Sequence, residues 1–317
     1  MQVKIYKKLE TGILLCLLLM VIMSSCTAKK QVIPSDTPLH GSINISVDES
    51  FKPVIDEEIK MYEGSYPGTK INVQYKPEAE CLKDLLNDSA TRLIIITRGL
   101  NSKEEKYFED SLDYIPRWDK IATDAIAVVV NANSKDTVFT MKRMQDQLSG
   151  KMLDKGKIIF DGLSATSTVR FAIDSILKGK TFDTSIVKAV KNSTEVLNYV
   201  ANNENAIGMV GISWIGNPED TAQVNLLKKV KIGYVECSIC GDSPYIKPNQ
   251  LSILTHRYPL VRGLYYILKE NYSGLGAGFV DFMQFERGQL IFKRAYLGSA
   301  KIGFAIRSIN INEKLKK

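Results

Sequence analysis

Four hydroxyl side chains fall within five positions of one short stretch, and an arginine follows two residues later. The hydroxyls belong to Ser164, Thr166, Ser167 and Thr168, and the arginine is Arg170. One hydroxyl is enough to cap the first turn of a helix. Free N–H groups at a helix start also attract anions, and several hydroxyls could satisfy several anion oxygens. Capping and anion binding are therefore both open for this stretch.

Strand-like and helix-like segments alternate along the chain, and the hydroxyl-rich stretch lies between one of each. Residues 43–47 alternate apolar and polar side chains, residues 92–96 and 121–130 are apolar runs typical of buried parallel strands, and residues 169–177 have apolar side chains at helical spacing. This alternation predicts an α/β protein with mostly parallel sheets.

Ligands of open α/β sheets bind where strands end and helices begin. Three stretches occupy such positions: 48–51, 97–100 and 164–170. Each contains hydroxyls or an arginine, so the three together favour an anion site over simple capping.

The N-terminus predicts the compartment. A basic start precedes an apolar stretch over residues 12–23, and Ser24 and Ser25 lead to Cys26. This layout is typical of a secretory signal, and the apolar stretch is shorter than a membrane span. The cysteine after small residues resembles a bacterial lipobox, so we expect a signal peptide over 1–25, a lipid on Cys26 and a tether over 26–40. A plain signal peptide or an uncleaved anchor are the alternatives.

Charge and composition exclude several classes. Removing residues 1–25 leaves 39 basic and 34 acidic residues, a mild net charge of +5 that suits an anionic ligand. Basic runs with interleaved aromatic residues are missing, so we expect no nucleic-acid binding. Cys237 and Cys240 form a lone CxxC motif, which argues against a structural zinc site and leaves a disulfide or two thiols open. We expect no metal and no cofactor.

The order of several segments resembles the periplasmic phosphate-binding proteins of ABC phosphate importers. The segments are "IIITR", "DAIAVVVNAN", "STVR", "NAIGMVGISW", "YPLVRGLYYIL" and "FMQFERGQL", and the resemblance covers about residues 42–305. It implies a two-lobed type 2 periplasmic-binding-protein fold with a ligand cleft between the lobes. Residues 41–127 and 251–317 would form lobe 1, and residues 128–250 lobe 2. It also implies a monomer in the bacterial cell envelope, facing the periplasm or the exterior, with phosphate as ligand and an ABC permease as a possible partner.

The resemblance also implies site residues. Ser50 and Phe51 match the first-lobe loop of the family, and Thr97 and Arg98 a second loop of that lobe. Thr166, Ser167 and Thr168 match the second-lobe loop.

Two departures from the family pattern matter. Where the family has a glycine- and serine-rich loop, this chain has "KPEAEC", with Glu78 and Glu80. Glu78 could face the site and would then repel a dianion, or favour a protonated one, whereas a solvated loop is equally open. The arginine that often precedes the second-lobe loop is absent, so Arg170 or Arg98 would supply the charge.

Two other classes compete with a transport receptor. A hydrolase would need a positioned histidine, but the chain has only His40, in the tether, and His256, which we expect to be partly buried and structural. We therefore expect no enzyme. An envelope lipoprotein with the same fold that acts as a sensor, or binds another small ligand, stays open.

Overall fold

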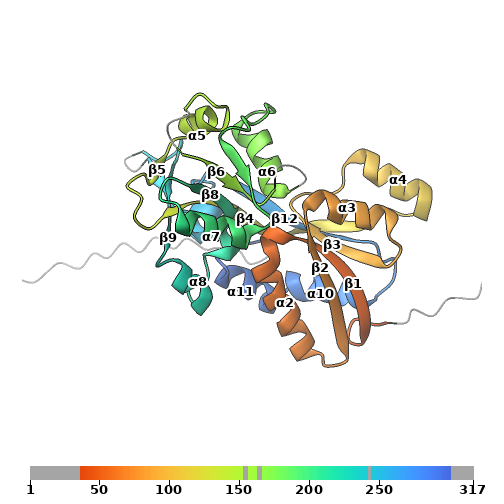
Figure 1. Cartoon of the computed structure of the whole chain (residues 1–317). Helices are drawn as coiled ribbons and strands as arrows, with labels where there is room; N and C mark the ends of the chain where they lie inside the picture. The colour runs from red at the N-terminus through yellow and green to blue at the C-terminus, as the bar shows by residue number, and fades with distance from the viewer. Residues whose placement is uncertain (1–35, 153–155, 163–165, 242–243, 301–317) are drawn as a thin grey trace, which may run out of the picture. The chain divides into compact units, whose positions relative to one another are not determined.

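The computed structural model describes residues 36–152, 156–162, 166–241 and 244–300. The predicted signal peptide, Cys26, residues 26–35 of the tether, Ser164 and residues 301–317 of the proposed return segment lie outside the described residues. Within them, strands and helices alternate as the sequence predicts (Figure 1). No helix among the described residues is both long and apolar enough to cross a membrane.

The first part of the chain forms a small α/β unit. Its elements are β1 (Gly41–Asp48), η1 (Glu49–Phe51), α2 (Lys52–Ser65), β2 (Thr69–Lys76), α3 (Glu78–Asn87), β3 (Thr91–Ile96) and α4 (Ser102–Leu112). β1 pairs in parallel with both β2 and β3. Ile43, Ile45 and Val47 of β1 are buried, as their alternation predicts. α2 begins with a proline in its first turn, where the missing N–H costs nothing.

The middle part forms a second α/β unit. Its longer elements are α5 (Met141–Leu148), α6 (Ser167–Phe171), a π-helix (Ala172–Ile176), α7 (Ser193–Asn202) and α8 (Thr221–Leu226). Its strands are β5 (Val138–Phe139), β6 (Ile158–Phe160), β7 (Val187–Ala189), β8 (Ile207–Gly211), β9 (Val230–Ile232), β10 (Tyr234–Glu236) and β11 (Tyr245–Ile246), with η4 (Ile212–Trp214) after β8. β6 pairs in parallel with β7 and β8.

Two long strands join these units. β4 (Arg117–Asn131) and β12 (Val261–Leu268) lie at the centre of the sheet order β2-β1-β3-β12-β4-β8-β6-β7. β12 is antiparallel to β3 and β4, and β4 is antiparallel to β8. The prediction of a parallel strand over 121–130 was therefore wrong, and the sheet is mixed. A continuous apolar run reports burial on both faces of a strand but says nothing of the direction of its neighbours.

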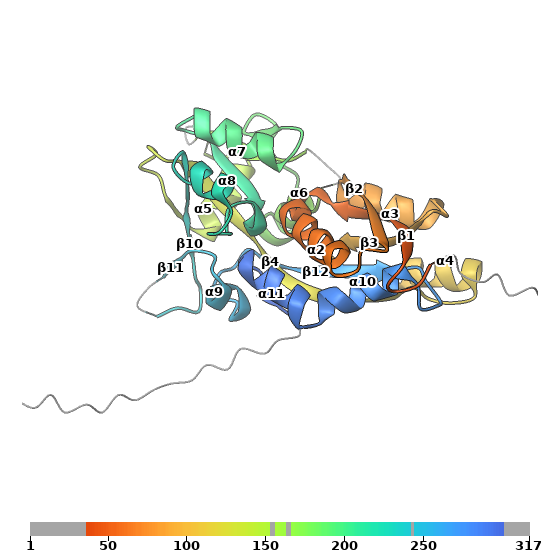
Figure 2. The same ribbon diagram turned by 90° about the horizontal axis from the view of Figure 1, so that it is seen from below.

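The last helices cover the central strands. After α9 (Gln250–Leu254) and β12, the chain continues into α10 (Leu275–Gln284), α11 (Glu286–Arg294) and the short strand β13 (Gly298–Ser299). α10 and α11 pack against α2 and against the joining strands β12 and β4 (Figure 2). Apolar residues of α2, α10, α11, β12 and residues 121–130 of β4 share one core, so the joining strands are largely buried and not a free linker.

Candidate functional site

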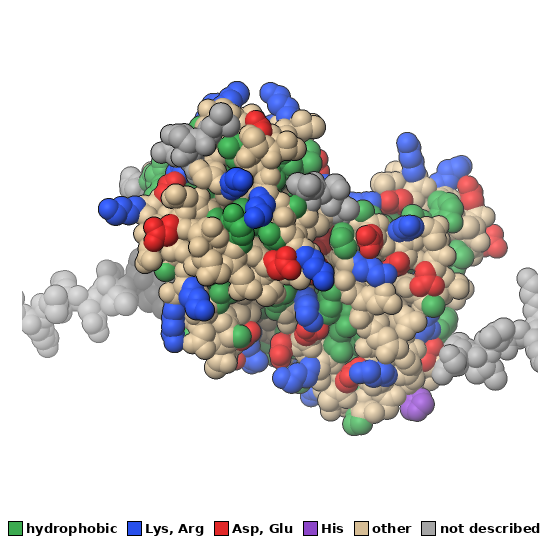
Figure 3. Space-filling view, viewed as in Figure 1, with side chains coloured by type: hydrophobic (Ala, Val, Ile, Leu, Met, Phe, Trp, Pro, Cys, Tyr) green, Lys and Arg blue, Asp and Glu red, His purple; other side chains and the backbone are tan. Residues whose placement is uncertain are grey.

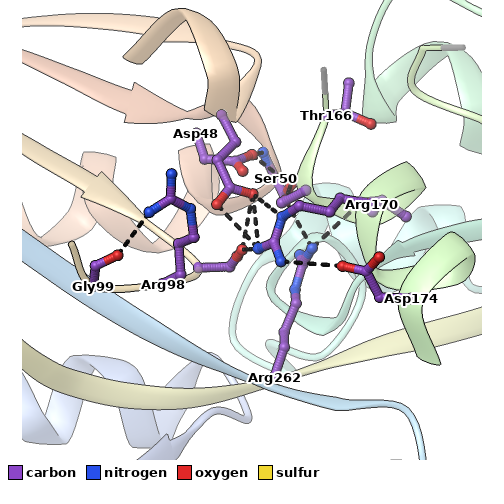
Figure 4. Close-up of polar contacts among 12 residues, drawn as sticks. Asp48, Ser50, Arg98, Gly99, Thr166, Arg170, Asp174 and Arg262 are labelled. Carbon is purple, nitrogen blue, oxygen red and sulfur yellow. Dashed lines mark hydrogen bonds and ion pairs between the residues drawn. The ribbon is translucent and has the colours of Figure 1, made fainter. Parts of the chain in front are cut away.

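Two of the predicted hydroxyl turns meet in space. Ser50, which follows β1, and Ser167, the first residue of α6, are 117 positions apart in sequence, yet their Oγ atoms are 3.1 Å apart. Both side chains are fully buried. Each lies where a strand leads into a helix, the position that the sequence predicts for a ligand. We call Ser50 and Ser167 the hydroxyl pair, and Figure 4 labels Ser50 together with Arg98, Arg170 and Arg262.

An arginine that sequence reasoning missed lies against this pair. Arg262 of β12 donates from Nη1 to Ser167 Oγ at 2.8 Å and from Nε to Asp124 Oδ2 of β4 at 2.7 Å. Its guanidinium lies over the ring of Phe51, 5.0 Å from the centroid, so Phe51 contacts Arg262 through its ring face. The available signal was a charged residue inside each of two apolar strand sequences, "IATDAIAVVV" and "YPLVRGLYYIL".

Two further buried carboxylates surround the hydroxyl pair. Asp48 accepts from the backbone N–H and the hydroxyl of Ser50, at 2.9 and 2.6 Å, through one oxygen, Oδ1. Asp161, after β6, accepts from the hydroxyls of Thr166 at 3.0 Å and Thr168 at 3.4 Å. Burial raises the pKa of Asp161 to about 6, and the Asp48 charge adds to the shift. The predicted ligand hydroxyls of Thr166 and Thr168 are thus engaged by a carboxylate.

A second polar group joins the two halves of the sheet. Arg170 of α6 donates to both oxygens of Glu78 at the start of α3, with Nη2–Oε1 at 3.0 Å, and to Thr97 Oγ1 at 2.6 Å. Thr97 in turn donates to Glu78 at 2.9 Å. Burial raises the pKa of Glu78, although the Arg170 guanidinium opposes the shift. Of the two glutamates, Glu78 is buried and paired, whereas Glu80 is exposed.

Arg98 is turned away from the hydroxyl pair. Its guanidinium donates to both oxygens of Glu104, at 2.7 and 2.8 Å, and to the Gly99 carbonyl at 2.9 Å. Glu104 also accepts from the backbone N–H of Asn101 in the capping box of α4, so Arg98 is fixed by that helix start. Among the described residues, Arg262 and Arg170 donate to predicted hydroxyls, whereas Arg98 does not.

A cavity of about 340 Å³ opens next to Asp48, which accepts from Ser50, and Thr166, which precedes Ser167, although neither serine of the hydroxyl pair lines it. Its charged lining consists of three carboxylates and three lysines: Asp48, Glu49, Asp161, Lys52, Lys76 and Lys191. Tyr75, Trp214 and Thr166 also line it. On the face of the molecule that Figure 3 shows, basic and acidic side chains are interspersed. Among the described residues, no three His, Cys, Asp or Glu side chains are placed to hold a metal ion.

The two histidines and the CxxC motif, which the sequence also singled out, lie outside the lining of the cavity. Cys237 and Cys240 form a disulfide after β10. His40 and His256 are both exposed, so the prediction of a partly buried His256 was wrong. His256 has a positive φ of 53°, in the turn that follows α9, and this turn presents the imidazole to solvent.

Comparison with known families supports the fold. The family model described as the PBP (periplasmic binding protein) superfamily domain matches residues 33–287. The chain therefore belongs to the periplasmic-binding-protein superfamily, and its mixed α/β fold is that of the type 2 members. A search of curated protein sequences found no match.

Solved structures of low sequence identity share this fold. A putative phosphate ABC transporter substrate-binding protein from Clostridium perfringens, solved with bound phosphate, is 20% identical with a TM-score of 0.67, covering 82% of this chain and 100% of that chain. An ABC-type phosphate transport receptor from Vibrio cholerae is 18% identical with a TM-score of 0.56 over the same shares. The regulatory domain of CcmR from Synechocystis PCC6803, solved with 2-PG, is 11% identical with a TM-score of 0.52, covering 77% and 96%. The fold therefore occurs in both transport receptors and regulators.

Proposed function

We propose that the protein is a solute-binding lipoprotein of the bacterial envelope that captures inorganic phosphate for an ABC importer, and that it acts as a monomer without catalysis. The observation that carries the proposal is the hydroxyl pair, in which Ser50 and Ser167 meet beside the buried Arg262. Hydroxyl donors and one guanidinium are the groups that a small oxyanion needs. The phosphate-related titles of the similar structures support the same ligand.

The carboxylates favour a protonated oxyanion. Asp48 and Asp161 are acceptors beside the hydroxyl pair, so a bound anion that keeps a proton can donate to them. Hydrogen phosphate and dihydrogen phosphate have such a proton, whereas sulfate has none at neutral pH. A fully ionised anion has no proton to donate and would be repelled by these carboxylates. Phosphate should therefore bind in preference to sulfate.

The contact between Ser50 and Ser167 sets a geometric requirement. An anion that bridges the two hydroxyls has to part them, because 3.1 Å leaves no room for a tetrahedral group. We propose that residues 41–127 with 251–317, and residues 128–250, form two lobes that move on β4 and β12 as hinges. Contacts between the proposed lobes would then break or reform: Glu49 with Ser193 at 2.7 Å, and Glu78 with Arg170 at 3.0 Å.

Calorimetry with purified mature protein tests the ligand. We expect phosphate to bind and sulfate to compete poorly, with no turnover of phosphoesters or peptides. Failure to bind phosphate would overturn the proposal, and a hydrolysis rate that disappears in Ser167→Ala would replace it with an enzyme.

Membrane fractionation tests the anchor. Cys26 follows an apolar stretch and two serines, so Cys26→Ala should block lipid attachment and either release the protein or leave it unprocessed. A variant that stays in the membrane fraction at the mature size would contradict the lipid anchor without affecting the ligand.

A further inference from the structure

The cavity beside the hydroxyl pair is lined by two buried carboxyl side chains, Asp48 and Asp161, and by a third, Glu49, that is half-buried. Asp48, Glu49 and Asp161 all line it, and among the described residues none of them forms an ion pair with a lysine or arginine. Asp48 is 1% exposed, and its Oδ2 atom has no hydrogen-bond partner among the residues that the structure describes. The three carboxylates accept hydrogen bonds from hydroxyls but form no ion pair with any of those residues, so a cationic or donating occupant would stabilise them.

The lysines of the cavity do not meet that demand. Lys52 pairs with Asp56 and Lys76 with Asp84, each at 2.7 Å, so both ammonium groups are held by acids that do not line the cavity. The third lysine, Lys191, is exposed and forms no ion pair with the three carboxylates in the described part of the chain. Lys52 also lies over the ring of Tyr75, 4.4 Å from the centroid. Trp214, another aromatic residue of the lining, has a buried indole N–H with no partner among the described residues. The wall thus combines carboxylates that form no ion pair with two aromatic side chains, and the ring of one of them, Tyr75, already lies against an ammonium group.

The carboxylates are also close to the predicted oxyanion position. Asp48 Oδ1 is 2.6 Å from Ser50 Oγ. Asp161 accepts a hydrogen bond from Thr166, which precedes Ser167 in the chain. An ammonium group that reaches Asp48 or Asp161 from the hydroxyl pair therefore needs only a short linker to its oxyanion.

We propose that the cavity receives the ammonium group of a zwitterionic ligand, a phosphate monoester or phosphonate with a primary amine, whose oxyanion binds at Ser50 and Ser167. This inference rests on the proposed function, since it needs an oxyanion at the hydroxyl pair, and it narrows the substrate class. The amine neutralises the carboxylates, whereas inorganic phosphate adds negative charge to them.

Calorimetry on the parent protein tests the class with three ligands: 2-aminoethyl phosphate, ethyl phosphate and inorganic phosphate. The first two differ chiefly in the amine. We expect 2-aminoethyl phosphate to bind at least about tenfold more tightly than ethyl phosphate, because an ion pair forms in a desolvated site. Equal affinities for the two esters would overturn the inference.

A matched pair of variants assigns the effect to the cavity. Asp161→Asn keeps a side chain of the same shape and should reduce the advantage of the amine to about threefold or less. Glu57→Gln removes the same charge from an exposed position on α2 outside the cavity and should leave the advantage unchanged. Asp48→Asn provides a second test should Asp161→Asn melt at a lower temperature. An undiminished advantage in both cavity variants would overturn the inference.

The ligand series separates this inference from the proposed function. Tight binding of inorganic phosphate with no binding of either ester would overturn the inference and support phosphate as the ligand. Binding of 2-aminoethyl phosphate without binding of inorganic phosphate would support the inference and overturn phosphate as the ligand.

Discussion

Arg262 lies directly opposite Asp124 in the antiparallel pairing of β12 with β4, and its Nε donates to Asp124 Oδ2 at 2.7 Å. Both side chains are buried, and the same guanidinium reaches Ser167 at 2.8 Å. The joining strands therefore hold a fixed positive group beneath a turn that comes from a distant part of the chain. In the proposed site, stability and ligand binding would both depend on this pair.

Removing the guanidinium should destabilise the protein. Arg262→Met leaves Asp124 buried without its cation, and the expected loss in the free energy of unfolding is about 3–5 kcal/mol. Urea denaturation measures it. The double variant Arg262→Met/Asp124→Asn should recover part of the loss, because the uncompensated charge is gone. Equal stability of the single and double variants would show that Asp124 is not the cause.

Removing one hydroxyl of the pair should weaken phosphate binding. A hydrogen bond to a charged group contributes about 1.5–3 kcal/mol, so Ser167→Ala should raise the dissociation constant roughly ten- to a hundredfold. Ser111→Ala is the control, because its hydroxyl is exposed on α4 and bonds only the Tyr107 carbonyl. Calorimetry on both variants decides the point, and similar affinities would argue against the hydroxyl pair as the site.

Stability should depend on pH through Asp161 and Glu49. Burial raises the pKa of Asp161 to about 6 and that of Glu49 to about 7, although hydrogen bonds from Thr166 and Ser193 oppose the shifts. A carboxyl whose pKa is higher in the folded state binds its proton more tightly when the protein is folded. Its contribution to stability is therefore fully present below the pKa of the unfolded state, near 4, and is lost as the pH rises through the pKa of the folded state.

Chemical denaturation of the parent and of two variants measures this effect. Between about pH 4 and pH 7, the parent should lose stability relative to Asp161→Asn and Glu49→Gln, which do not titrate. Carboxylates whose pKa is lowered, such as Asp36, contribute equally to the parent and to the variants, so their effect cancels in the difference. A difference that stays constant over this range would contradict the raised pKa values.

Neutralising Glu78 should tighten phosphate binding modestly. Glu78→Gln removes a buried negative charge and loosens Arg170, whose side chain is 42% exposed, so solvent screens the gain. We expect the dissociation constant to fall about two- to fivefold in calorimetry. Glu80→Gln is the control, since Glu80 is exposed on the same helix. A weaker affinity in Glu78→Gln would mean that its pairing with Arg170 shapes the site.

The sequence alone determined the features that depend on neighbours along the chain. Alternation over 43–47 and helical spacing over 169–177 predicted β1 and the helix of the hydroxyl turn, and both are observed, the latter as α6 continued by a π-helix. Hydroxyls after strands also made Ser50 and Ser167 candidates, because strand ends of an α/β sheet are a local feature, and the two side chains meet in the structure.

Only the tertiary structure decided which charged groups join the hydroxyls. By sequence, Arg98 and Arg170 were equal candidates for the cation of the site. In the structure, Arg98 pairs with Glu104 at the start of α4, whereas Arg170 pairs with Glu78. Arg262 and Asp124 are 138 residues apart, and only the register of two antiparallel strands places them opposite one another. Local sequence patterns indicate which face of a strand is buried. The direction and register of a strand depend on partners that are distant in the sequence, and the charged groups of this site depend on that register.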